Sequence, residues 1–290
     1  MMNFNFSHYK NSAEGFRKFA LESLNKTYNN YKANLERIHN EFSEDNVHDL
    51  RVAIRRFISA LDFFSNFYPT YYFKKIKKEI KSQFDSLSQL RDIQVMMITT
   101  IKMKVSFPQL YEFLIYLIEK EYEQININKI KFAEIDVNYF DDYYYFLSRT
   151  IRIDFQNIEI NFEDVSKIIQ TKYKEIIEYK SLIDFDNPQT IHQLRIKIKK
   201  FRYMLENLSE VMSKSKRILN ILSNFQTKMG LFQDSEVYIK EFTNFVNLNG
   251  MDEVAKLQVS DYLKEIKFKL FLDIKNNIKM LDRLFKSESI

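Results

Sequence analysis

The 290-residue chain contains no cysteine and no tryptophan, and only three glycines and three prolines. The lack of cysteine excludes disulfides, thiolate metal sites and cysteine nucleophiles, and it fits a reducing compartment. Because so few residues break helices, we expect long helices whose turns are made by Asn, Asp and Ser. Hydrophobic residues make up 45% of the chain, which is enough for a substantial core.

Long apolar stretches and targeting segments are also missing. No uninterrupted apolar run approaches the ~20 residues that a membrane span requires. The first residues, MMNFNFSHYKNSAEGF, lack the basic and apolar regions of a signal peptide. We therefore expect a cytoplasmic protein with no membrane partner.

The excess of positive charge is modest. The net charge is +5, so the arrangement of the charges matters more than their total. The high content of Ile, Asn, Lys, Tyr and Phe is typical of an AT-rich genome, which makes the abundance of lysine weak evidence. Arginine clusters are more informative, because such a bias favours lysine.

Hydrophobic periodicity predicts an all-α protein. We expect a second helix to open at Ser43 and to stop before Pro69, and a later one to open at Asn187 and Pro188. Residues 151–162 instead alternate apolar and polar side chains, which predicts a short extended connector. The helices are expected over residues 12–40, 43–68, 71–88, from 92 onwards, over 105–150 with breaks, from about 163, from 187, and over 213–229, 233–248 and 252–285.

Two segments of the sequence occur twice. NVHDLRVAIRRF (46–57) matches HQLRIKIKKFR (192–202), and His192 follows His48 by 144 residues. LSQLRDIQV (87–95) matches MGLFQDSEV (229–237) at an offset of 142. Two separate motifs in the same order indicate an internal duplication. We predict a single domain over 1–290 whose halves, about 10–155 and 160–287, form two antiparallel helical bundles related by an approximate two-fold axis.

Each copy of the first motif places cations on one helix face and apolar residues on the opposite face. Like charges four residues apart, such as Arg51 and Arg55 or Arg195 and Lys199, cost about a few tenths of a kcal/mol. A solvated face would mix in acids at these spacings, as the segment DYLKEIKFK does. We infer that a bound anion supplies the missing charge, since arginine binds phosphate bidentately.

The next helix in each half carries further cations. If it packs antiparallel to the motif helix, both rows of charge line one groove. Cations spaced by about one helical turn suit a polymer of phosphates better than one small ligand. The predicted anion-binding residues are His48, Arg51, Arg55, Arg56, Lys74, Lys78, Lys81, Arg91, His192, Arg195, Lys199, Lys200, Arg202, Lys216 and Arg217.

Structural explanations compete with this assignment. The cations could be solvated surface charges, and His48 and His192 could make only local hydrogen bonds near a helix start. Asp92 and Asp234 are expected to cap the helices that follow them. Arg91 is expected to be structural as well, although its side chain could reach the basic face.

Signatures of catalysis and of metal binding are missing from the sequence. It has no H-x-x-x-H or H-E-x-x-H pair, no phosphate-binding glycine loop and no acidic cluster of the two-metal kind. Asp141 and Asp142 are expected to form a polar loop beside a packed helix. We predict no catalytic residue, no metal and no cofactor.

The four repeated segments resemble the CHAD family, the conserved-histidine α-helical domains. HDLRVAIRR and LSQLRDIQV match the family's two motifs, with Ser88 at the usual glycine position. HQLRIKIKK and MGLFQDSEV resemble their second copies, with Lys199 and Lys200 in place of two arginines and Gln233 in place of a third. The similarity runs from about residue 10 to 285.

This resemblance implies two helical bundles with pseudo-two-fold symmetry around a basic cavity that binds inorganic polyphosphate. It implies no catalysis and, as in some members, association with polyphosphate granules. By carry-over, phosphate would contact His48, Arg51, Arg55, Arg56, His192, Arg195, Lys199 and Lys200. The lysines keep the charge but lose the bidentate geometry, which argues against equal affinity in the two halves.

Four other functions use the same cations. One is nucleic-acid binding, another is an accessory role in polyphosphate metabolism, and the third is a scaffold for an acidic protein. The fourth is an enzyme that cuts or builds polyphosphate, which would need a set of metal-binding carboxylates that the sequence does not offer. Nucleic acid is the weaker candidate, because the aromatic residues of the motif helices lie on the apolar face and are expected to be core.

Overall fold

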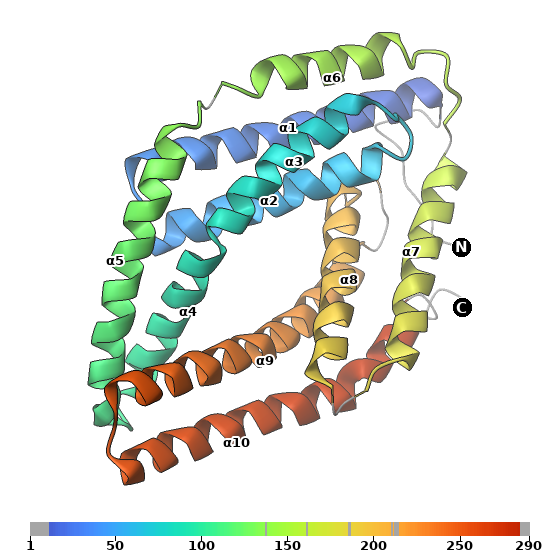
Figure 1. Ribbon diagram of the computed structural model, residues 1–290. Coiled ribbons are helices and arrows are strands. Elements are labelled where there is room, and N and C mark those ends of the chain that lie inside the picture. Colours follow the sequence, from blue (N-terminus) through green and yellow to red (C-terminus); the bar gives the residue numbers. More distant parts are fainter. Residues whose placement is uncertain are drawn as a thin grey trace.

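The computed structural model describes residues 12–136, 138–160, 162–184, 187–209, 211 and 215–284. Within these ranges the chain is all-helical and contains no strand (Figure 1). No helix there is long and apolar enough to cross a membrane. The elements are α1 (Ala13–Asn40), α2 (Glu44–Phe64), α3 (Tyr71–Ser86), α4 (Ser88–Met103), η1 (Pro108–Leu110), α5 (Tyr111–Ala133), α6 (Asp141–Ile153), α7 (Phe162–Ser181), α8 (Pro188–Asn207), α9 (Ser215–Asn249), α10 (Glu253–Asn277) and η2 (Ile278–Arg283).

Side-chain caps fix the starts of several helices. The hydroxyls of Ser12 and Ser43 accept hydrogen bonds from the backbone N–H three residues ahead, at 3.1 and 3.3 Å. The side chain of Asn187 accepts from the N–H of Gln189 at 3.1 Å. Each cap satisfies one of the backbone donors that a helix start leaves without a partner. The predicted starts of α1, α2 and α8 are confirmed.

The extended connector predicted over 151–162 is wrong. Ile151–Ile153 complete α6, and turns follow to residue 157. The side chain of Arg17 donates to the backbone oxygens of Phe155 and Gln156 at 3.5 and 2.8 Å. The alternating pattern therefore reflects a helix end followed by turns whose carbonyls are satisfied from α1. Asn161, within the predicted connector, lies outside the described residues.

The two helices predicted over 213–229 and 233–248 are one helix. α9 runs without interruption from Ser215 to Asn249, through Gly230. Gly230 costs helix propensity but does not by itself end a helix, and no proline follows it. In the first half, α3 and α4 are separate helices, with Leu87 between them. This difference between the halves gives Arg51 and Arg195 different surroundings, as described below.

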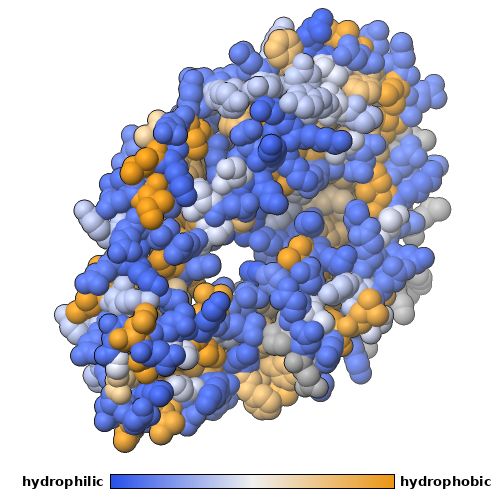
Figure 2. Space-filling model, viewed as in Figure 1, coloured by the Kyte–Doolittle hydropathy of each residue, from blue (hydrophilic) through white to orange (hydrophobic). Residues whose placement is uncertain are grey.

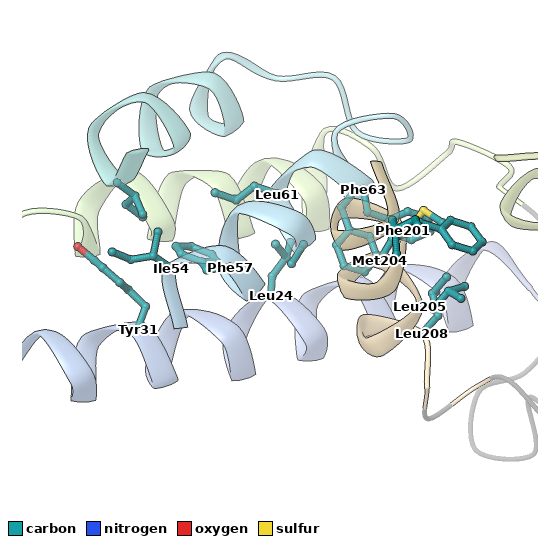
Figure 3. Close-up of a cluster of buried hydrophobic side chains, with 14 of the residues drawn as sticks. Leu24, Tyr31, Ile54, Phe57, Leu61, Phe63, Phe201, Met204, Leu205 and Leu208 are labelled. Atoms are coloured by element: carbon teal, nitrogen blue, oxygen red, sulfur yellow. The ribbon is translucent and has the colours of Figure 1, made fainter. Parts of the chain in front are cut away.

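The apolar faces of the two motif helices are buried as predicted. α2 and α8 pack against each other, and Phe63, Phe201 and Met204 gather where they meet (Figure 3). Most of this core belongs to one large cluster that draws residues from both halves of the chain. The buried positions predicted on these two helices are Leu50, Ala53, Ile54, Phe57, Leu61, Phe64, Leu194, Ile198, Phe201, Met204, Leu205 and Leu208.

A second, smaller apolar cluster lies at the other end of the molecule. α4, α5, α9 and α10 each contribute to both clusters. Along α4, Leu90 belongs to the large cluster and Ile93 to the small one. Along α9, Phe232 belongs to the large cluster and Tyr238 to the small one. Charged and polar residues lie on these helices between the two cores, and this boundary is called the seam below.

An opening passes through the middle of the molecule. The space-filling view shows it, surrounded mostly by hydrophilic residues (Figure 2). In the ribbon view the same region is framed by α2, α4, α8 and α9 (Figure 1). These four helices carry both copies of both repeated motifs.

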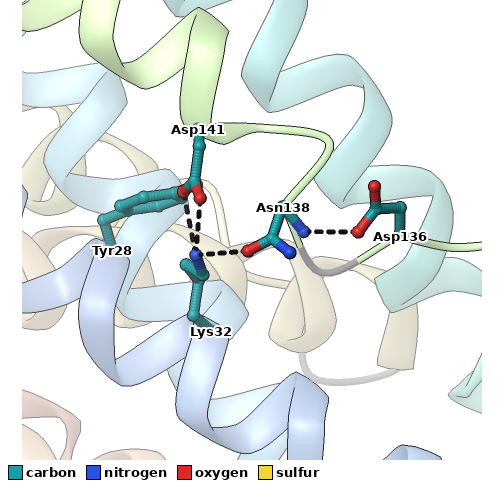
Figure 4. A network of polar contacts seen from close by, with 5 residues as sticks. All are labelled: Tyr28, Lys32, Asp136, Asn138 and Asp141. Atoms are coloured by element: carbon teal, nitrogen blue, oxygen red, sulfur yellow. Dashed lines mark hydrogen bonds and ion pairs between the residues drawn. The ribbon is translucent and has the colours of Figure 1, made fainter.

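Asp141 has a structural role, but the polar loop predicted for Asp141 and Asp142 is wrong, because both lie in the first turn of α6. Asp141 accepts hydrogen bonds from the Tyr28 hydroxyl at 2.6 Å and from the Lys32 ammonium at 2.8 Å (Figure 4). Lys32 also donates to the side chain of Asn138 at 3.1 Å. This network fastens the start of α6 to α1.

Phe57→Ala is expected to lower the free energy of unfolding by about 3–5 kcal/mol, because its fully buried ring packs against Tyr28, Tyr31 and Tyr144. Chemical denaturation followed by circular dichroism measures this loss. Phe268→Ala is the matched control: its ring is 58% exposed, and its loss should stay within about 0.5 kcal/mol. Similar losses in the two variants would contradict the assigned core.

Candidate anion-binding site

Packing of α2 against α8 brings the cations of the two motif helices together. Arg55 of α2 is near enough to Arg195 and Arg202 of α8 for each to lower its pKa, after the larger effect of burial. Arg91 of α4 acts on Arg55 in the same direction. These residues are called the cation cluster below; its members are Arg51, Arg55, Arg91, Arg195, Lys199 and Arg202.

Lys199 is strongly affected by its burial within this cluster. Burial, followed by repulsion from Arg55 and Arg195, lowers the pKa of Lys199 from 10.5 to about 7. None of Arg51, Arg55, Arg195 and Lys199 forms an ion pair with a carboxylate of the described residues. The protein thus holds several cations together at a cost, without neutralising them.

Arg51 is held in place by the end of α3. Its Nη1 donates to the backbone oxygen of Phe84 at 2.9 Å and to the hydroxyl of Ser88 at 3.0 Å. Its guanidinium also lies 4.1 Å from the centre of the Phe84 ring. The Phe84 carbonyl is available because it lies in the last turn of α3, where carbonyls lack the full set of helical partners.

Arg195, the matching residue of α8, has a different environment. Its Nε is buried and has no hydrogen-bond partner among the described residues. Nη2 and Nε lie 3.6 and 3.9 Å from the point where a Cβ at Gly230 would be. Gly230 matches Ser88 in the sequence repeat, so the hydroxyl that binds Arg51 has no counterpart here.

The two motif histidines also differ. The side chain of His48 keeps contact with solvent, and partial burial together with Arg91 and Arg55 lowers its pKa below 6.5. His48 is therefore neutral at neutral pH in the free protein. The Nδ1 of His192 hydrogen-bonds to the side-chain oxygen of Gln233 at 2.7 Å. Since an amide oxygen only accepts, this Nδ1 carries the proton.

Carboxylates that sequence reasoning did not identify neutralise part of the predicted row. Arg91 forms an ion pair with Glu44, in the first turn of α2. Glu206 pairs with Arg202 at 2.9 Å and with Arg56 at 3.4 Å. The Glu206 contact had a sequence signal, because Glu206 follows Arg202 by four residues. Glu44 has no such signal, since its partner lies on another helix.

The prediction that Asp92 and Asp234 are helix caps is wrong. Asp92 lies in the second turn of α4, and Asp234 lies in the middle of α9. The pKa of each carboxyl is raised, mainly by burial, although Arg195 acts to lower both. Asp92 also raises the pKa of Asp234, so the two face each other across the seam. Asp92 retains solvent contact, as expected on the wall of a concave surface.

The remaining predicted cations lie outside the cluster. Lys74, Lys78 and Lys81 are exposed on α3, and none of them is among the main influences on the pKa of Arg51, Arg55 or Lys199. Lys200 of α8 is exposed as well. Lys216 and Arg217 are exposed in the first turn of α9, where they line a shallow depression together with Asn220, Ile221 and Asn224.

Comparison with known proteins identifies the family of the chain. The family described as CHAD domain matches residues 22–117 and 161–242, which together make up more than half of the chain. The unmatched stretch between them contains the end of α5 and all of α6. No curated protein matches the chain in sequence.

Two solved structures share the fold. A crystal structure of the CHAD domain from the plant Ricinus communis superposes with a TM-score of 0.67 at 17% identity, over 92% of this chain and 89% of that chain. PptA from Streptomyces chartreusis superposes with a TM-score of 0.53 at 10% identity, over 93% of this chain and 98% of that chain. The predicted all-α fold of the CHAD type is confirmed.

Lys199→Met is expected to change how stability depends on pH. Between pH 7 and 10.5 the unfolded chain binds a proton at Lys199 that the folded protein releases, so the free energy of unfolding rises with pH. The variant should lose this part of the rise and should be more stable than the unaltered protein below pH 7. Chemical denaturation from pH 6 to 9 measures both effects.

Lys200→Met is the control for this experiment, because Lys200 is the exposed neighbour of Lys199. It should keep the pH dependence of the unaltered protein. A Lys199→Met variant with an unchanged slope would show that Lys199 is an ordinary, fully charged lysine.

Proposed function

The chain belongs to the CHAD family, and we propose that it binds inorganic polyphosphate in a basic cavity around the central opening. The observation that carries this proposal is the cation cluster itself. Arg51, Arg55, Arg195 and Lys199 are held close together without carboxylate partners among the described residues, and burial followed by repulsion from these arginines lowers the pKa of Lys199 to about 7. A polyanion that entered the cluster would remove this repulsion.

The arrangement favours a polymer over a small anion. The cluster draws residues from α2, α4 and α8, and the opening that these helices frame with α9 passes through the molecule (Figure 2). A linear chain of phosphates carries regularly spaced charge and fits such a passage. The two motif helices α2 and α8 both provide cations to the cluster.

The proposal is binding without catalysis. The gathered side chains neutralise charge, and the two carboxylates among them, Asp92 and Asp234, are each influenced by the arginines of the cluster. A cytoplasmic protein of this kind would be found with polyphosphate, including polyphosphate granules. Nucleic acid is the weaker ligand because Phe57 and Phe201, on the motif helices, are buried and cannot stack on bases.

Arg55→Gln/Lys199→Gln is expected to weaken binding of long-chain polyphosphate by about tenfold or more, since each lost charge removes a charged contact. Titration at about 0.15 M salt suppresses weak surface attraction. Lys74→Gln/Lys78→Gln removes the same charge from the exposed face of α3 and should change the affinity by less than about threefold. Equal losses in the two double variants would indicate a general anion surface.

Double-stranded DNA and single-stranded RNA are the competitors in the same titration. Polyphosphate that neither of them displaces would support a polyphosphate site. Displacement of polyphosphate by nucleic acid at equal phosphate concentration would instead support a nucleic-acid-binding function.

Binding is expected to take up protons at pH 7.5. Lys199, with a pKa of about 7, is largely neutral in the free protein, and a bound polyanion stabilises its ammonium form. The affinity should therefore fall as pH rises from 7 to 9. Calorimetry in two buffers of different ionisation enthalpy measures the uptake, and long polyphosphate keeps the contribution of its titrating chain ends small.

Lys199→Met should abolish most of the proton uptake, and Lys200→Met should retain it. If the binding enthalpy does not depend on the buffer, Lys199 is not a ligand of the polyanion.

A further inference from the structure

The two motif arginines have different surroundings because the helix that follows each motif differs. α3 ends at Ser86, so the carbonyl of Phe84 and the hydroxyl of Ser88 are both available to Arg51. α9 continues through the matching segment, where Gln226 is the counterpart of Phe84. The carbonyl of Gln226 lies inside this unbroken helix and accepts the helical hydrogen bond from the N–H four residues further on.

The side chains at the matching positions add to this difference. The side-chain oxygen of Gln226 accepts no hydrogen bond from Arg195; instead it accepts from the Nε of Arg202 at 2.8 Å. Gly230 has no side chain that could accept a hydrogen bond. The guanidinium of Arg195 therefore makes no hydrogen bond or ion pair with the part of the chain that the structure describes.

The Nε of Arg195 is covered beside Gly230, whereas Nη1 and Nη2 have no partner among the described residues and keep contact with solvent. Nη1 and Nη2 donate in parallel, which is the geometry of a bidentate contact with phosphate. A partly buried guanidinium without a partner is costly, so it is stabilised when an anion arrives. Arg51 has already used its Nη1 donor on Phe84 and Ser88 and would have to give up these contacts.

We infer that Arg195 is the arginine that anchors the phosphate chain, whereas Arg51 braces α2 against the junction of α3 and α4, and that the residue at positions 88 and 230 decides between the two roles. This inference rests on the proposed function and divides its site into a structural half and a ligand-holding half. A hydroxyl at position 230 would hold Arg195 as Ser88 holds Arg51.

Single substitutions of the two arginines test the division of roles. Arg195→Gln should lower the affinity for long-chain polyphosphate about tenfold or more and leave the melting temperature unchanged or raised, because a partly buried cation without a partner is removed. Arg51→Gln should lower the melting temperature and reduce the affinity by a smaller factor. Equal losses of affinity with equal melting temperatures would overturn the inference while leaving polyphosphate binding intact.

Substitutions of Gly230 test the mechanism without touching an arginine. Gly230→Ser should weaken binding about three- to tenfold without lowering the melting temperature, because its hydroxyl accepts from Arg195. Gly230→Ala is the matched control: its Cβ makes an ordinary contact with Arg195 at 3.6 Å and offers no acceptor, so the affinity should stay within about twofold. Equal binding by both variants would overturn the role of position 230.

Isothermal titration with long-chain polyphosphate and thermal melting by circular dichroism provide the two readouts, on the full chain. If the unaltered protein bound no polyphosphate, the proposed function would fall and the inference with it. If it bound polyphosphate but Arg195→Gln did so equally well, only the inference would fall.

Discussion

The apolar faces of α2 and α8 pack against each other, and this contact decides where the charged residues lie. Each motif helix is amphipathic, so burying one face aims the other in a fixed direction. Because the buried faces meet, the basic faces of the two helices come within electrostatic range, as the mutual effects of Arg55, Arg195 and Lys199 show. The hydrophobic gain of this contact outweighs the repulsion that it imposes.

Repulsion is limited by selective neutralisation. Glu206 pairs with Arg56 and Arg202 at one side of the cluster, and Glu44 pairs with Arg91 at the other. Arg51, Arg55, Arg195 and Lys199 have no such carboxylate partner in the part of the chain that the structure describes. The positions of the acids thus distinguish cations that support the fold through ion pairs from cations that are free to bind an anion. The amino-acid composition alone does not show this distinction.

Much of the fold could be predicted from the sequence, because its signals are local. The buried positions of α2 and α8 follow from a period of 3.6 residues, and the caps Ser12, Ser43 and Asn187 act within one turn. The alternation over 151–162 misled because a helix end followed by turns produces the same short pattern. The continuity of α9 through Gly230 was missed because a lone glycine does not determine whether a helix stops.

The site was harder to predict, because its contacts join distant segments. Arg51, Arg55, Arg195 and Lys199 were found through the repeat, yet the exposed position of Lys74, Lys78 and Lys81 depends on how α3 packs. The contact of Arg51 with Phe84 depends on a break between α3 and α4. Asp92 and Asp234 were taken for caps because their place inside helices is fixed only when the helix boundaries are known.

The seam between the two apolar clusters has a mechanical consequence. Four helices cross it, and the side chains that fill it on α4 and α9 include charged and polar groups around an opening (Figures 1 and 2). Because the described apolar packing divides into two clusters here, we expect the easiest collective motion to be a flexing of one cluster against the other. Arg91 of the cation cluster lies at this boundary on α4, so a polyanion bound beside it would be expected to stiffen the molecule there.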